Sequence, residues 1–161
     1  MPQIKPEYEL VKEFADIASA LVERHPSMFG GIDIGRVRCF AIMNKKRKDD
    51  KVLWEIKAVG MPMLIDCPFA WYYTIYMGDW AEMSDKHRQH LVADMLFAIP
   101  KDGEEGKINR FDMKDFSVML RSFGTDYLQN SPDELTDLLS GDVKWVYTVD
   151  GDNDSDDEDG D

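Results

Sequence analysis

The chain has 161 residues, 43% of them hydrophobic, which is enough for one domain with a buried core. Its 32 acidic residues outnumber its 19 basic ones, and the formal net charge of −13 argues against nonspecific binding to DNA or to an anionic membrane over the whole surface. The same charge permits a basic protein partner or the mimicry of nucleic acid.

Residues 7–24 carry apolar side chains at helical spacing after Pro6, a residue favoured in the first turn of a helix, so a helix is predicted there. Residues 36–43 and 52–59 alternate between two faces and are predicted to be strands. The charged residues 45–51 between them indicate a hairpin or a wider strand–loop–strand connection. Acidic residues interrupt this basic run, which favours a solvated loop over a phosphate-binding one.

Residues 70–77 are rich in aromatic and β-branched side chains and are predicted to form a third strand, which turns at residues 78–79. A helix is predicted over residues 84–99, with Ser84 as its N-cap and Pro100 as its end. The second half of this helix is apolar on nearly all sides. We therefore expect it to run through the centre of the domain and to organise the rest of the chain.

The C-terminal third predicts an amphipathic helix over residues 112–123, which ends at Gly124. A short helix is expected over residues 131–140, because Ser131, Pro132 and Glu134 combine an N-cap, a first-turn proline and a capping box. Residues 143–149 are β-prone and are a candidate edge strand. The predicted fold class is α+β, with a small sheet of three or four strands, an N-terminal helix, a central helix and C-terminal helices.

Residues 150–161 contain eight carboxylates and no apolar residue, so they are predicted to be a disordered acidic tail after a folded domain of residues 1–149. Without the tail, the formal charge of the chain is −5 rather than −13. The tail resembles the start of a calcium loop, but Ser155 replaces the glycine at the sixth position, so calcium binding is not expected. The candidate interaction residues are its carboxylates: Asp150, Asp152, Asp154, Asp156, Asp157, Glu158, Asp159 and Asp161.

The two cysteines, Cys39 and Cys67, are too far apart in sequence for a close-spaced metal or redox motif. We expect two reduced thiols, with a disulfide as the alternative if the fold brings them together. The first residues contain no apolar signal segment, and no apolar run reaches the length of a membrane span. These features predict a cytoplasmic protein without membrane contact.

The order of predicted elements is the layout of a zincin-like domain. Beyond that layout, the chain resembles the phage metallopeptidase family from about residue 8 to residue 124, with residues 125–149 as an extension. The resemblance rests on four stretches: Ile32–Val37, Tyr72–Tyr76 with Trp80, Met83–Ile99, and Gly106–Asp112 with Phe116.

Members of this family follow a similar lead-in with a His-Glu-x-x-His motif. The two histidines hold zinc, and the glutamate takes a proton from zinc-bound water, whose pKa the metal lowers to about 7. Here the corresponding positions hold Asp94, Met95 and Ala98, and a later histidine position of the family is Phe111. The resemblance therefore implies a degenerate member with no catalytic residue, no metal and no cofactor.

The three histidines of the chain do not replace the missing motif. His87 and His90 lie three residues apart on the predicted helix, but no third ligand accompanies them, so two surface histidines are expected rather than a metal pair. His25 is expected to be a dipole partner at the end of the first helix. Asp94 is either a buried carboxylate with a hydrogen-bond partner or a residue at the solvent edge; the sequence leaves both open.

These features favour a non-enzymatic phage protein that acts by binding a protein, and that inhibits or redirects a host factor such as a basic, nucleic-acid-binding or defence protein. Direct binding of nucleic acid is not expected. One alternative is an active metal-dependent peptidase that uses Asp94, His90 and a distant carboxylate. A second alternative is a small virion or assembly component.

Overall fold

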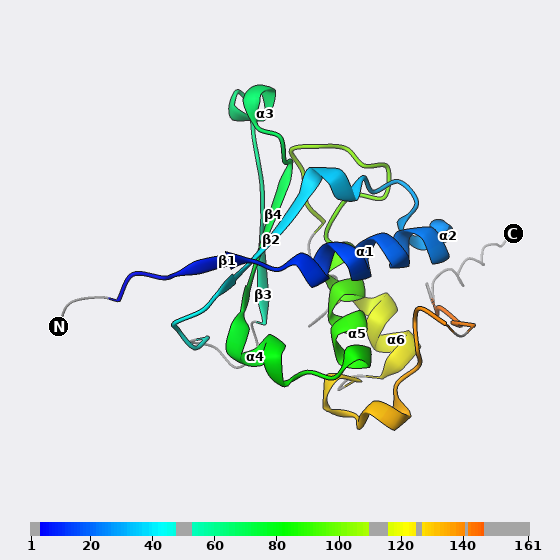
Figure 1. Cartoon of the computed structure of the whole chain (residues 1–161). Helices are drawn as coiled ribbons and strands as arrows, with labels where there is room; N and C mark the ends of the chain where they lie inside the picture. The colour runs from blue at the N-terminus through cyan, green and yellow to red at the C-terminus, as the bar shows by residue number, and fades with distance from the viewer. Residues whose placement is uncertain (1–3, 48–52, 110–115, 125–126, 141, 147–161) are drawn as a thin grey trace, which may run out of the picture.

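The computed structural model describes residues 4–47, 53–109, 116–124, 127–140 and 142–146. Within these residues the fold is α+β: helices pack against one four-stranded mixed sheet (Figure 1). The sheet has the strand order β1-β2-β4-β3. This fold class is the one that the sequence predicts, and it is compatible with a metallopeptidase-like domain.

The sheet combines parallel and antiparallel pairs. Its strands are β1 (Tyr8–Leu10), β2 (Val37–Ile42), β3 (Trp54–Ala58) and β4 (Trp71–Tyr76). β2 runs parallel to β4, whereas β1 is antiparallel to β2 and β3 is antiparallel to β4. β3 is therefore an edge strand, and β2 and β4 form the centre.

The helices lie mainly on one side of this sheet. They are α1 (Lys12–Arg24), α2 (Pro26–Phe29), α3 (Met63–Asp66), α4 (Met77–Glu82), α5 (Asp85–Leu96) and α6 (Ser117–Phe123). Single 3-10 turns are η1 (Ile34–Arg36), η2 (Tyr127–Gln129) and η3 (Pro132–Glu134). In Figure 1, α1, α5 and α6 cover one face of the sheet, α3 projects beyond one end of it, and α4 lies at the other end.

The core lies between the sheet and α5. Every residue from Gln89 to Leu96 is buried, as the apolar second half of the predicted helix requires. The helix begins where it was predicted, because the Ser84 side chain accepts a hydrogen bond from the His87 backbone N–H. Its regular part ends at Leu96, a few residues before Pro100.

The predicted N-terminal helix begins too early. Tyr8–Leu10 is strand β1, not helix, and pairs with the edge of β2. Val11 has an extended backbone and donates from its N–H to the Cys39 carbonyl, so the helix begins only at Lys12. The edge of β2 has backbone N–H and C=O groups that need hydrogen-bond partners. Residues 8–10 supply these partners as a strand, whereas a helix at this position would bond within itself and leave them unpaired.

Of the two connections predicted between the strands over residues 36–43 and 52–59, the hairpin is wrong, and a wider strand–loop–strand connection is compatible with the observed order. Both strands exist in shortened form as β2 and β3, but β4 inserts between them. The sheet reaches four strands through β1 and not through the C-terminal residues, because Val143–Val146 form no strand in the described part of the chain. Residues 147–149 lie outside the described residues.

Two helix boundaries differ from the prediction. The turn expected at residues 78–79 lies inside α4, which connects β4 to the loop before α5. The helix expected over residues 131–140 is only the 3-10 turn η3, although its capping box forms: the Ser131 N–H donates to Glu134 Oε1 at 3.2 Å. The helix predicted over residues 112–123 is described from Ser117, and Gly124 ends it with a φ of 93°, a backbone conformation that favours glycine.

Candidate functional site

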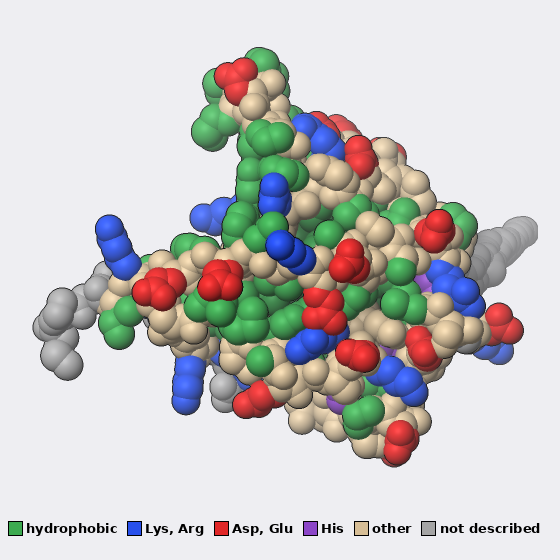
Figure 2. Space-filling view, in the orientation of Figure 1, with side chains coloured by type: hydrophobic (Ala, Val, Ile, Leu, Met, Phe, Trp, Pro, Cys, Tyr) green, Lys and Arg blue, Asp and Glu red, His purple; other side chains and the backbone are tan. Residues whose placement is uncertain are grey.

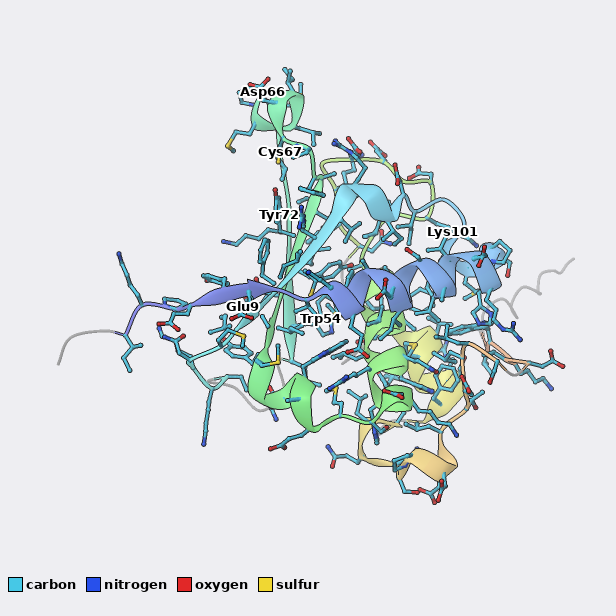
Figure 3. The ribbon with its side chains drawn as sticks, in the orientation of Figure 1. Glu9, Trp54, Asp66, Cys67, Tyr72 and Lys101 are labelled. Atoms are coloured by element: carbon cyan, nitrogen blue, oxygen red, sulfur yellow. The ribbon has the colours of Figure 1, made fainter. Side chains whose placement is uncertain are left out.

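The positions that the sequence resemblance assigns to the family motif, Asp94, Met95 and Ala98, lie on α5 and just after it. Asp94 is buried, with 1% of its surface exposed, which decides the question that the sequence leaves open. The Trp54 indole N–H donates to Asp94 Oδ2 at 3.4 Å, from a ring on the side of β3 that faces the helices (Figure 3). The carboxylate is therefore held between α5 and the edge strand.

Met95 and Ala98 offer no group suited to hold zinc in a site of the family type or to move a proton. The Met95 side chain is completely buried, and its backbone carbonyl accepts a hydrogen bond from the Tyr73 hydroxyl on β4. Ala98 is also buried and ends in a methyl group. A thioether is a weak acceptor and a methyl group has no donor atom, so these residues do not fit the role of zinc ligands or of a general base.

A hollow of about 320 Å³ opens beside Ala98, between β3 and the residues that follow α5. Most of its lining is apolar. The lining residues are Trp54, Glu55, Ile56, Lys57, Ala98, Ile108, Asn109 and Phe116. The motif region is thus closed by packing at Met95. Next to Ala98, which is itself buried, the hollow opens to solvent. Phe111, the fourth degenerate position, lies outside the described residues.

A metal centre of another kind is not formed in the described part of the chain. There, no group of three or more His, Cys, Asp and Glu side chains comes close enough to hold a metal ion. The ligand set of Asp94, His90 and a distant carboxylate is accordingly not assembled among these residues. The candidate calcium loop and all eight tail carboxylates lie outside the described residues.

The expectation that His87 and His90 are surface residues is wrong. His90 is completely buried, and its Nε2–H donates to the Thr136 carbonyl at 2.8 Å. His87 is half-buried, and its Nε2–H donates to the Asn130 carbonyl at 2.7 Å. Both histidines therefore attach α5 to the segment of residues 127–140.

His25 does the same from the end of α1. Its Nε2–H donates to the Leu138 carbonyl at 2.7 Å, while the Trp145 indole N–H lies 3.4 Å from its Nδ1. Gln89 adds a fourth contact, because its Oε1 accepts from the Leu138 N–H at 3.0 Å. All three histidines of the chain thus donate to backbone carbonyls of residues 127–140, a role that spacing in the sequence did not indicate.

His90 lies in a largely apolar environment. Its ring is 4.5 Å from the Phe123 ring, and Nδ1 has no hydrogen-bond partner among the described residues. Burial is the main cause that lowers the pKa of His90, the bond to the Thr136 carbonyl opposes this effect, and electrostatic interactions with His87 and Lys86 add to the lowering. The buried ring is therefore neutral, with its proton on Nε2.

The second cysteine has a polar environment that the sequence did not reveal. Both cysteines are free, as expected. The bond between Cys67 Sγ and the Tyr72 hydroxyl, at 3.3 Å, is the main cause that lowers the pKa of Cys67, and the Phe69 backbone and Arg36 add to it. Burial raises the pKa of Cys39 to about 12, so that thiol stays protonated.

Arg36 connects this region to the body of the domain. Its guanidinium donates to both oxygens of Glu105, at 2.6 and 2.8 Å, and also to the carbonyls of Cys67 and Pro68. The bidentate bond to Glu105 is the main cause that raises the pKa of Arg36. The loop between β3 and β4 is thereby attached at its base.

The comparison with known families agrees with the resemblance seen in the sequence. The family model described as "Putative phage metallopeptidase" matches residues 6–140. The chain belongs to this phage metallopeptidase family. No curated protein and no solved structure matches the chain. Among the described residues of this phage metallopeptidase-like protein, no helix combines the length and the apolar character needed to cross a membrane.

Proposed function

We propose that this member of the phage metallopeptidase family is not an enzyme and acts by binding protein. The observation that carries the proposal is the environment of Met95, at the position of the family's general base: the side chain is completely buried in the core. A base must reach the water that it activates, and neither the thioether nor its surroundings provide for that. In this proposal α5 has the position of the family's catalytic helix but serves only to form the core.

The donor set near Met95 supports the same conclusion. Asp94 accepts from the Trp54 indole, and Ala98 has no ligand atom. His90 donates its Nε2–H to the Thr136 carbonyl and is completely buried, and no group of three or more His, Cys, Asp and Glu side chains that could hold a metal ion includes it among the described residues. A zinc site of the family type requires three protein ligands around an open position, and these residues do not provide them.

The partner that we propose is a host protein, which the phage protein inhibits or redirects. The support is charge: a chain of −13 with eight carboxylates in its last twelve residues suits a basic surface, such as the groove of a nucleic-acid-binding or defence protein. The hollow beside Ala98 offers an additional apolar contact surface.

Metal analysis tests the absence of catalysis. Protein purified without chelator is expected to contain no stoichiometric zinc and to cleave no casein-type substrate. Asp94→Ala should leave the metal content unchanged, with Asp16→Ala on the exposed face of α1 as the matched control. About one zinc per chain that is lost in Asp94→Ala but kept in Asp16→Ala would support the peptidase alternative and refute the proposal.

A capture experiment tests the role of the tail. The full chain and a variant without residues 150–161 are each used to capture proteins from host lysate at increasing salt. We expect the truncated protein to bind its partner more weakly and with a flatter salt dependence, because fewer charges are screened. Equal binding by both would remove the tail from the proposal, and capture only with phage particles would favour the virion alternative.

A further inference from the structure

β3 ends the sheet with backbone groups that point away from it. The Val59 N–H donates to the Ala70 carbonyl at 2.8 Å, which makes Val59 and Ala70 a hydrogen-bonded pair of the antiparallel ladder. Because such pairs alternate, Glu55 and Lys57 direct their backbone groups towards β4, and Ile56 and Ala58 direct theirs outward. Within the described chain, no further backbone hydrogen bond reaches Ile56 or Ala58.

The sequence of β3 is complementary to itself when one copy runs antiparallel to another. If Ile56 is placed opposite Ile56 of a second copy, Glu55 faces Lys57 in both halves of the pair. This register also joins residues whose backbone groups already point outward, so the hydrogen bonds form without rotation of either strand. A shift of one residue would lose both the charge pairs and the match of backbone groups.

The two charges are available for such pairing. Glu55 and Lys57 are exposed, lie on the sheet face away from the helices, and take part in no ion pair within the described residues. Opposite charges directly across an antiparallel pair stabilise it, and like charges destabilise it. β3 therefore selects one register and one orientation.

The loop after β3 provides apolar area for the same contact. We call residues 60–69 the lobe; it contains α3 and projects beyond the sheet (Figure 2). Met61, Met63 and Ile65 are 69%, 67% and 71% exposed, the largest values among the exposed hydrophobic side chains of the described residues. The register pairs residues 54–58 of the two copies, so each lobe lies just beyond the end of the paired strands, beside the contact. Exposed apolar groups of this kind usually indicate an interaction surface.

We propose that the occupant of the β3 edge is a second copy of this chain, and that two sheets join through β3 into one continuous sheet around a two-fold axis at Ile56. The two-fold axis makes each contact occur twice. The inference rests on the proposed function in one respect: a working peptidase would need the approach to Ala98 open, whereas the second copy lies next to it.

Charge reversal tests this dimer with the full chain. Sedimentation velocity over the micromolar range is expected to show a dimer for the wild type. Lys57→Glu and Glu55→Lys should each weaken the dimer roughly tenfold or more, because two attractive pairs become two repulsive ones. Lys12→Glu, which makes the same charge change at an exposed position of α1, is the matched control and should not weaken it.

Variants that restore the opposite charges at positions 55 and 57 distinguish this interface from a general effect of net charge. An equal mixture of Lys57→Glu and Glu55→Lys should form a heterodimer, since each Glu of one chain then faces a Lys of the other. The double variant should again form a homodimer. The N–H of Ile56 should exchange with solvent more slowly in each dimer than in the single variants.

Three outcomes would overturn the inference. They are a wild type that stays monomeric at the highest concentration, a dimer that the single variants leave unchanged, and a mixture that does not associate. A monomer whose Ile56 N–H exchanges quickly would leave the edge to an extended segment of another protein. Zinc content and peptidase activity are measured separately, so an inactive, zinc-free monomer refutes the dimer alone, and an active zinc protein refutes the proposed function.

Discussion

The two ends of α5 show how differently similar side chains can be used within one helix. Near its beginning, His87 and His90 have the chemistry of metal ligands, yet both donate to carbonyls of residues 127–140. Near its end lie Asp94 and Met95, which the sequence resemblance assigns to a ligand position and to the base position, and both are buried in the core. The comparison teaches that neither the residue type nor the position alone makes a catalytic site; the two must coincide.

The largest effect is expected from a change that restores the family residue at the base position. Met95→Glu places a carboxylate where no exposed surface and no water are available, and should lower the free energy of unfolding by about 4 kcal/mol. Met95→Leu preserves volume and polarity and should cost less than about 1.5 kcal/mol. Urea denaturation followed by tryptophan fluorescence measures both.

The opposite result would show that the end of α5 is not closed by packing. If Met95→Glu folds as stably as Met95→Leu and also retains zinc, the end of α5 is open enough to support a metal site, and burial was not what separates the two ends.

The second-largest effect on the free energy of unfolding is expected from His87 and His90 on α5. His90→Ala removes the donor to the Thr136 carbonyl and leaves a cavity beside Phe123, so a loss of about 3 kcal/mol is expected. His87→Ala should cost about 1 kcal/mol, because that ring is only half-buried and water can replace its bond to the Asn130 carbonyl. Urea denaturation of both variants gives the ranking.

Hydrogen exchange sharpens this prediction. In His90→Ala, amides of residues 127–140 should exchange faster than those of β2 and β4, since the segment loses an attachment while the sheet keeps its ladder. Uniform acceleration across the chain would mean that His90 stabilises the whole core and not this segment in particular.

The parts of the fold that the sequence predicted are those with local causes. Ser84 caps α5 through a neighbour three residues away, and β2 shows its two faces in its own alternation. β1 and the pairing of β3 with β4 were missed, because strand partners are chosen by tertiary contacts and not by the strand itself.

In the candidate site, too, the features with local causes were predicted from the sequence and those that depend on distant residues were not. The absence of ligand atoms at Met95 and Ala98 is visible in the residue types, so it was predicted from the resemblance. The burial of Asp94 and the role of His90 depend on Trp54 and Thr136, which are forty or more positions away and carry no local signal. The hollow beside Ala98 likewise requires residues from four separate segments.

The smallest of the three effects is a dependence of stability on pH that begins at the histidine end. Burial lowers the pKa of His90 below its ordinary value of 6.5, so between the two values the unfolded chain binds a proton that the folded chain does not. The contribution of the neutral ring is complete above about pH 6.5 and is lost as the pH falls below it. The free energy of unfolding should therefore be lower at about pH 5.5 than at about pH 7.5. In His90→Gln, whose amide can still donate but does not titrate, this difference should shrink, whereas Asp94→Asn at the other end of α5 should not remove it. An unchanged pH dependence in His90→Gln would show that another group causes the loss, and that protonation does not distinguish the two ends of the helix.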